Sequence, residues 1–131
     1  MNAVPNAVQE VPPPRGVILI VEDEIELSRL FSEVIRGAGF EVVAAYSVTD
    51  ALSTLNDQRF DAAILDIELR DGSVFPVADK LTASHTPFIF ASAVYSQMVP
   101  KQYQATPFVA KPFHLEDLLA RVEAAVAGDG E

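Results

Sequence analysis

The stretch AAILDIELRDGS, Ala62 to Ser73, joins an apolar run to a carboxylate, and it decides what kind of fold the chain can adopt. Ala62 to Leu65 is short and entirely apolar, which is typical of a strand buried on both faces of a sheet. Asp66 follows at once, and a carboxylate at the end of a buried strand is destabilising unless other groups compensate its charge. The sequence therefore predicts a parallel sheet with a charged site where this strand ends.

Apolar segments alternate with amphipathic ones along the rest of the chain. We expect strands at residues 16–21, 40–46, 61–66, 86–92 and 106–113, the last of them ending in a turn. We expect helices at residues 25–38, 48–55, 73–81 and 115–127, and a weak helix at residues 97–103, which contains Pro100. This alternation predicts an α/β domain, a parallel sheet with helices on both faces joined by right-handed crossovers.

Composition narrows the function before any motif is considered. The 131 residues carry a net charge of −10, whereas nucleic acids and anionic membranes select basic surfaces, so we expect neither as a partner. The chain has no cysteine, which excludes disulfides, thiolate metal sites and cysteine nucleophiles. No apolar run approaches the roughly 18 residues of a membrane helix and no signal-peptide pattern precedes the first strand, so we expect a cytoplasmic protein.

The domain boundaries follow from the same pattern. Residues 1–15 are Pro-rich and aperiodic and are expected to form a flexible tail. Residues 16–127 are expected to form one domain, and residues 128–131 a disordered C-terminus. Because no effector domain follows residue 127, we expect a single-domain protein whose output is protein–protein contact.

Polar side chains stand at the carboxyl ends of four of the five predicted strands. Open parallel sheets bind ligands at this edge, where the order of the strands reverses. The residues are Glu22 and Asp23 after the first strand, Asp66 at the end of the third, Ser92 at the end of the fourth and Lys111 in the turn of the fifth. Folding would gather three carboxylates, a hydroxyl and an amine in one shallow cleft.

The residue types in this cleft predict chemistry on phosphate. Carboxylate and carbonyl oxygens are the ligands that Mg²⁺ prefers, so Glu22, Asp23 and Asp66 predict a magnesium site. A carboxylate beside the metal stays ionised and can attack phosphorus, while the metal and Lys111 stabilise the charge of the transferred group. Glu22 and Asp23 alone could equally be acids that favour the N-terminus of the next helix. Their combination with Asp66 favours the site.

Four motifs at these strand ends carry a resemblance to a known family. LIVEDE (residues 19–24), ILDIELRDGS (64–73), FAS (90–92) and AKPF (110–113) stand in the order and at the spacing of the family. From residue 16 to about residue 127 the chain resembles the receiver domain of two-component response regulators, in which an aspartate accepts a phosphoryl group from a histidine kinase. The resemblance implies a flavodoxin-like doubly wound fold with a five-stranded sheet in the order 2-1-3-4-5, flanked by five helices of which the fourth is weak.

The resemblance also implies a role for each residue of the cleft. Asp66 is expected to be the phosphoacceptor. Glu22, Asp23 and the backbone carbonyl of Glu68 are expected to hold Mg²⁺ together with Asp66. Lys111 is expected to bind the phosphoryl group.

A switch is implied as well. Ser92 stands at the position of the switch hydroxyl, Phe108 at that of the switch aromatic, and we expect Tyr95 to report the state of the switch together with Phe108. PFIFASAVY, Pro87 to Tyr95, is similar to the signature PFxFATG followed by G or Y of a subgroup of alphaproteobacterial single-domain receivers, with Ala93 in place of its glycine. The subgroup implies a sensor histidine kinase of the HWE or related type, or a histidine phosphotransferase, as the partner of a monomer.

Two other function classes remain open on the residues. A pseudo-receiver would keep the fold as a binding module without being phosphorylated, but here the full set of site residues is present. A small phosphatase of the haloacid dehalogenase type also uses an aspartate nucleophile and Mg²⁺, but it needs a second aspartate where this chain has Glu68. We therefore expect a phosphoacceptor that assists its own phosphorylation and dephosphorylation, and not an enzyme.

Overall fold

The computed structural model describes residues 13–93 and 99–128 and contains the expected parallel sheet. Its strands are β1 (Val17–Val21), β2 (Glu41–Ala45), β3 (Ala62–Leu65), β6 (Phe88–Ser92) and β7 (Phe108–Ala110). They lie in the order β2-β1-β3-β6-β7, and each neighbouring pair is parallel. The predicted fold class and the predicted strand order 2-1-3-4-5 are therefore confirmed.

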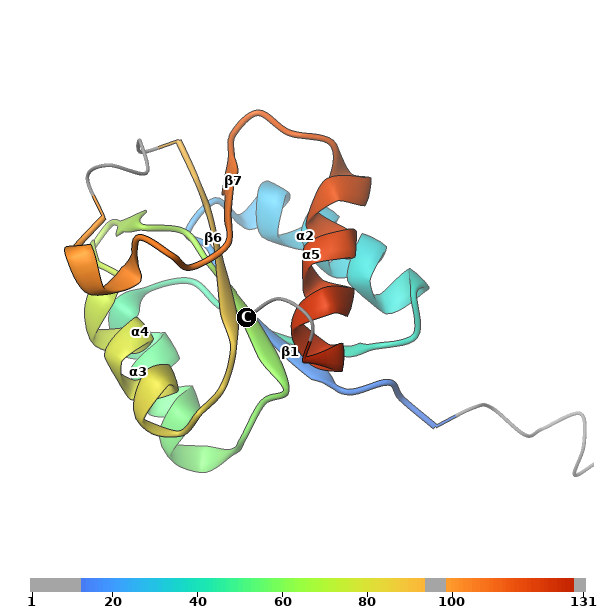
Figure 1. Ribbon diagram of the computed structural model, residues 1–131, viewed down its shortest axis with the longest axis horizontal. Coiled ribbons are helices and arrows are strands. Elements are labelled where there is room, and N and C mark those ends of the chain that lie inside the picture. The colour runs from blue at the N-terminus through green and yellow to red at the C-terminus, as the bar shows by residue number, and fades with distance from the viewer. Residues whose placement is uncertain (1–12, 94–98, 129–131) are drawn as a thin grey trace, which may run out of the picture.

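Two pairs of helices cover the two faces of the sheet (Figure 1). One face carries α2 (Ile25–Gly37) and α5 (Leu115–Ala127), and the other carries α3 (Val48–Asp57) and α4 (Phe75–Ala83). Alternate side chains of β1 enter the two cores, because successive residues of a strand point to opposite faces. Ile18 and Ile20 pack with α2 and α5, and Leu19 and Val21 pack with α3 and α4. The sheet is thus buried on both sides, as its apolar strands predict.

Local signals place several helix ends. Ser47 precedes α3, and its hydroxyl accepts a hydrogen bond of 3.0 Å from the backbone N–H of Asp50. Pro76 lies in the first turn of α4, where its missing N–H costs no helical hydrogen bond. Beyond α2 the chain turns at Gly39, whose φ of +101° is strained for any residue with a Cβ. In the described residues no helix is both long and apolar enough to cross a membrane.

Two segments depart from the predicted elements. The predicted helix at residues 97–103 is a 3₁₀ helix over Lys101–Tyr103, while residues 94–98 lie outside the described part of the chain. Pro100 stands at the N-cap of that short helix and cannot donate a helical hydrogen bond. A small antiparallel hairpin, β4 (Glu68–Leu69) and β5 (Gly72–Ser73), occupies the region directly after Asp66. As a result α4 begins at Phe75 and not at Ser73.

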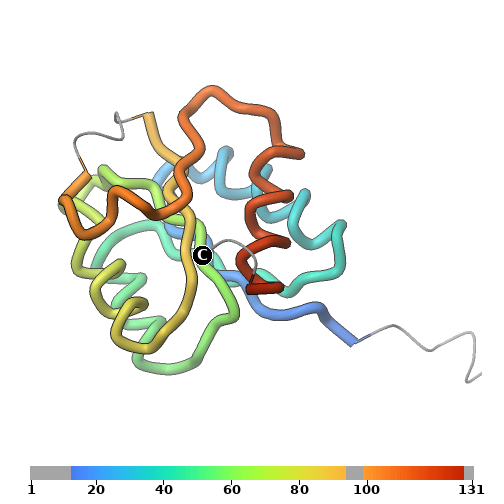
Figure 2. Tube along the Cα trace, viewed as in Figure 1, coloured from blue at the N-terminus to red at the C-terminus, as the bar shows by residue number. Residues whose placement is uncertain are grey.

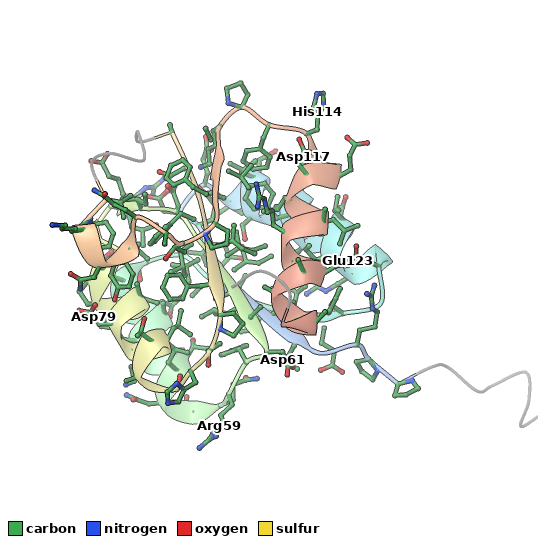
Figure 3. The ribbon with its side chains drawn as sticks, in the orientation of Figure 1. Arg59, Asp61, Asp79, His114, Asp117 and Glu123 are labelled. Atoms are coloured by element: carbon green, nitrogen blue, oxygen red, sulfur yellow. The ribbon has the colours of Figure 1, made fainter. Side chains whose placement is uncertain are left out.

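The folded chain extends to Arg15, one residue before the expected boundary at Gly16. Its backbone N–H donates to the carbonyl of Gly39 (2.9 Å), and its guanidinium lies 4.6 Å from the centre of the Phe40 ring. The same guanidinium forms an ion pair of 2.9 Å with Glu123 of α5, a residue labelled in Figure 3. Figure 2 shows the N-terminal trace passing beneath this end of α5. Arg15 therefore belongs to the folded domain, in contact with the turn after α2 and with α5.

Aromatic side chains fill the core between β6 and α4. Phe90 is fully buried and lies edge-on to Phe75, Phe88 and Tyr103 at ring-centre distances of 5.5–6.1 Å. Phe108, its register partner on β7, lies 6.4 Å from it. The 3₁₀ helix is therefore attached to the domain mainly through the ring of Tyr103, whose hydroxyl donates to Asp79 of α4 (labelled in Figure 3).

Phe90→Ala should lower the free energy of unfolding by about 3–5 kcal/mol, because it removes a buried ring and leaves a cavity among four others. Urea denaturation followed by circular dichroism would measure this loss. Leu30→Ala on α2, where the residue is 43% exposed, is the control and should cost less than about 1 kcal/mol. Equal losses for the two variants would contradict the assignment of Phe90 to the centre of the core.

Candidate functional site

The sheet itself brings the predicted site residues together at the carboxyl ends of its strands. The backbone N–H of Asp66 donates to the carbonyl of Val21 at the end of β1 (2.9 Å). The N–H of Lys111 donates to the carbonyl of Ser92 at the end of β6 (3.0 Å), and the N–H of Glu22 donates to the last carbonyl of β2 (3.1 Å). Their side chains therefore start from adjacent points on one edge of a rigid scaffold.

Lys111 compensates the charge of Asp66, but it does so together with a second carboxylate. Its Nζ donates to Oε1 of Glu22 at 2.9 Å and to Oδ2 of Asp66 at 3.2 Å. Glu22 is 2% exposed, and its other oxygen accepts a hydrogen bond of 3.1 Å from the backbone N–H of Glu24. The shorter contact of the lysine is thus with Glu22, a pairing that the sequence did not indicate.

The carboxylates of Glu22, Asp23 and Asp66 form a cluster that can hold a metal ion. One oxygen of each lies within 4.8 Å of the others. With these three groups and Lys111 ionised, the cluster has a formal charge of −2, which a divalent cation would neutralise. The donors are hard oxygens at the open edge of the sheet, with no soft ligand in the cluster, and this donor set fits Mg²⁺.

The hairpin geometry bears on the predicted carbonyl ligand, Glu68. Glu68 is paired with Ser73, and the N–H of Val74 donates to the carbonyl of Ile67 (2.9 Å), one step before that pair. In an antiparallel ladder, hydrogen-bonded and non-hydrogen-bonded pairs alternate, so Glu68 belongs to a non-hydrogen-bonded pair. The backbone carbonyl of Glu68 therefore points away from β5 and toward the outside of the hairpin.

Burial and pairing set the ionisation of Glu22 and Lys111. Burial raises the pKa of the Glu22 carboxyl; the hydrogen bond from Lys111 opposes this and the charge of Asp66 adds to it, so the pKa stays above its usual value. Burial lowers the pKa of Lys111, but the hydrogen bond to Glu22 and the charges of both carboxylates outweigh it, and the pKa is raised. The lysine therefore remains a cation in this site.

Of the three residues expected to form a switch, the structure describes Ser92 and Phe108. Ser92 ends β6 and is 1% exposed. Phe108 begins β7, is partly buried and packs against the ring of Phe90. Tyr95 lies outside the described residues.

Asp71 makes contacts that the sequence analysis did not predict. Its carboxylate accepts hydrogen bonds from the backbone N–H groups of Val48 and Thr49 at the start of α3. These partners lie 22 and 23 residues away in the chain, so no local pattern could have indicated them.

Comparison with known proteins agrees with this geometry. The model of the response regulator receiver domain matches residues 18–123. Among curated proteins, the uncharacterized transcriptional regulatory protein YkoG of Bacillus subtilis is 31% identical over 121 residues, which cover 88% of this chain and 53% of that protein. The sensory transduction protein LytT of Enterococcus faecalis is 36% identical over 115 residues, which cover 82% of this chain and 47% of LytT. The chain thus spans about half the length of these relatives.

Solved structures share the same architecture. The response regulator TrrA of Thermotoga maritima, solved in complex with Mg²⁺ and BeF, is 26% identical with a TM-score of 0.74, and the match covers 83% of this chain and 97% of TrrA. A CheY-like receiver domain from Methanospirillum hungatei shares the fold with a TM-score of 0.78 at 19% identity, over 86% of this chain and 94% of that one. The family match over most of the chain, together with the relatives above 30% identity, shows that this chain belongs to the response regulator receiver domain family.

Proposed function

We propose that this protein accepts a phosphoryl group on Asp66 from a phosphohistidine of a histidine kinase in a phosphorelay, and that it signals through contact with another protein. The observation that supports this most directly is the position of Asp66, 8% exposed at the end of β3 and held between Lys111 and an acidic pair. That arrangement holds the carboxylate of Asp66 at the edge of the sheet, 3.2 Å from the Nζ of Lys111. The resemblance of PFIFASAVY to the alphaproteobacterial signature favours a kinase of the HWE or related type.

The transfer forms one bond and breaks one. A carboxylate oxygen of Asp66 attacks phosphorus, the phosphorus–nitrogen bond to the donor imidazole breaks, and the imidazole keeps the electron pair. Lys111, which donates to Oδ2 of Asp66, is placed to pair with the oxygens of the incoming group. A bound Mg²⁺, held by Glu22, Asp23, Asp66 and the carbonyl of Glu68, would supply further positive charge for the phosphoryl oxygens.

An apolar groove beside the site suits the partner that delivers the phosphoryl group. The groove has a volume of about 550 Å³ and borders Lys111. Leu30 of α2 lines it and is 43% exposed, and Phe31 and Phe113, which also line it, stack at 5.7 Å. A donor histidine must come within bonding distance of Asp66, so its protein has to dock against surfaces at this edge of the sheet. We propose that the domain carrying the donor histidine occupies this groove.

Phosphorylation of Asp66 would also act on the residues proposed to form the switch. An aspartyl phosphate adds negative charge and acceptor oxygens that the hydroxyl of Ser92 and the amine of Lys111 can bind. We propose that movement at Ser92 makes room beside Phe108, whose ring then turns inward, and that Tyr95 reports the change together with it. The partner surface would then comprise β6, β7 and α5.

Asp66→Asn should abolish phosphorylation by a small phosphodonor in the presence of Mg²⁺, because the amide is not a nucleophile toward phosphorus. Intact mass spectrometry should find one phosphoryl group on the wild type, lost in both acid and base and on treatment with hydroxylamine as acyl phosphates are, and none on the variant. Asp57→Asn at the end of α3 is the control and should be phosphorylated like the wild type. Wild-type uptake by Asp66→Asn would assign the phosphoacceptor elsewhere, and no uptake by the wild type would favour an unphosphorylated binding module.

Mg²⁺ should stabilise the folded protein more strongly at pH 7.5 than at pH 5. Because the pKa of Glu22 is raised, its contribution to stability is greatest below the unfolded value of 4.5 and falls as pH rises through the folded value. The ion relieves that destabilisation and adds about 1.4 kcal/mol at ten times its dissociation constant. Melting curves with and without Mg²⁺ would measure both effects.

Glu22→Gln, which cannot ionise, is the control for this pH dependence. In that variant the stabilisation by Mg²⁺ should be smaller and should vary less between pH 5 and pH 7.5. A wild type whose melting temperature rises equally at the two pH values would contradict the assignment of Glu22 to the metal site.

Binding of beryllofluoride, a phosphoryl mimic, should change the amide chemical shifts of residues 91–113 most strongly. The physical reason is that the mimic draws Ser92 and Lys111 toward Asp66, and both lie within this range. Asp66→Asn should show none of these changes under the same conditions. Shift changes confined to the neighbours of Asp66, with Phe108 unaffected, would contradict the proposed switch and favour a simple phosphate acceptor.

A further inference from the structure

The β4–β5 hairpin is too small to hold its own position. Each strand has only two residues, and an isolated two-stranded hairpin is marginal in water. Leu69 is 8% exposed and packs into the core beside α3 and α4, but Glu68, Gly72 and Ser73 are exposed. Additional contacts must therefore fix the hairpin relative to Asp66, which it follows after a single residue.

Asp71, in the two-residue turn of this hairpin, supplies such contacts. Its Oδ1 accepts a hydrogen bond of 2.8 Å from the N–H of Val48. Its Oδ2 accepts two bonds from Thr49, one of 3.0 Å from the N–H and one of 3.1 Å from the hydroxyl. The backbone N–H groups of Val48 and Thr49 hold the pKa of Asp71 below its usual value, so the acceptor is a carboxylate at neutral pH.

The first turn of α3 is thereby capped by two different residues. Ser47, directly before the helix, accepts from the N–H of Asp50 through its hydroxyl and from the N–H of Ala51 through its carbonyl, both at 3.0 Å. Asp71 accepts from the first two N–H groups of the helix. Both residues therefore stabilise the same helix end, but only Asp71 connects that end to the hairpin.

The hydrogen bonds of Asp71 link the two chain segments that position Glu22 and Asp66. Val48 lies three residues after Ala45, the end of β2, and the carbonyl of Ala45 accepts a hydrogen bond of 3.1 Å from the N–H of Glu22. Asp66, five residues before Asp71 in the turn, donates its own N–H to β1. Glu22 and Asp66, which these segments position, belong to the same carboxylate cluster. Asp71 thus fixes the hairpin to the strand end from which Glu22 emerges.

We propose that Asp71 is a positioning residue for the metal site: it holds the hairpin so that the outward-facing carbonyl of Glu68 stays aligned with Glu22, Asp23 and Asp66. The proposal rests on the metal role given to these residues above, and it assigns Asp71 no contact with metal or phosphate. Losing this alignment should weaken Mg²⁺ binding without removing any ligand. Residues that orient metal ligands typically change affinity by about tenfold or more, and we expect about threefold to tenfold for one that acts through a backbone carbonyl.

Calorimetric titration of the intact chain with Mg²⁺ alone would test this. Asp71→Ala should raise the dissociation constant about threefold to tenfold. Ser47→Ala is the matched control: it removes a cap from the same helix end, lowers the melting temperature, and should leave the dissociation constant within about twofold of the wild type. Thr49→Val removes one of the three contacts with Asp71 and should give an intermediate value. It also keeps the test available should Asp71→Ala not fold.

Amide hydrogen exchange in the metal-free protein provides a readout independent of the ion. The N–H of Val74, bonded to Ile67 at the base of the hairpin, should exchange faster in Asp71→Ala and Thr49→Val but not in Ser47→Ala. Unchanged Mg²⁺ affinity in the Asp71 and Thr49 variants would reduce Asp71 to a helix cap and overturn the proposal. A wild type that binds Mg²⁺ but is not phosphorylated would instead count against the proposed function alone, because the titration requires no phosphoryl transfer.

Discussion

Lys111 joins two carboxylates that the fold places at one edge of its sheet, and the arrangement of the site depends on this ion pair. Glu22 is almost fully buried, so without a cation nearby its charge would be strongly destabilising. Removing one partner of a buried ion pair typically costs about 3–5 kcal/mol, because the remaining charge stays buried. The lysine therefore stabilises the fold and prepares the site with the same contacts. It also leaves the cluster short of two positive charges, which is the condition for binding a divalent cation.

The parallel sheet explains why these groups meet. Glu22, Asp66 and Lys111 each follow a strand, and hydrogen bonds between neighbouring strands fix the backbone at each of these positions. Two faces covered by helices leave only the strand ends accessible, so polar residues beyond the buried strands must collect there. In the proposed metal site, the hairpin after β3 would add the carbonyl of Glu68 to that edge, and the contact of Asp71 with α3 would restrain the hairpin. The position of the carboxylate cluster thus depends on three features: the ion pairs of Lys111, the pairing of the strands and the contact of Asp71 with the start of α3.

Signals within a few residues predicted the parallel sheet and the cleft at its edge, and the family resemblance supplied the order of the strands. Buried strands appear as continuous apolar runs in the sequence, and the polar residues that follow these runs indicate where the site lies. Features that depend on distant partners were not predictable. The pair of Lys111 and Glu22 joins residues 89 apart, and the pair of Arg15 and Glu123 joins residues 108 apart. The hairpin was missed because four residues of strand give no measurable periodicity, and the weak helix was overestimated because Pro100 limits it to one 3₁₀ turn.

The proposed switch would act through the described residues on either side of the connection between β6 and β7. Ser92 stands at one end of this connection, and Tyr103 anchors its other part among the rings of Phe75, Phe88 and Phe90. Phe108 touches the same cluster through Phe90, which is its register partner. A ring that turns at Phe108 must therefore change its packing against Phe90, and close-packed interiors transmit such changes. In the proposed switch, the hydrogen bond of Tyr103 to Asp79 would extend the response to α4, so we propose that the responding surface includes α4 as well as β6, β7 and α5.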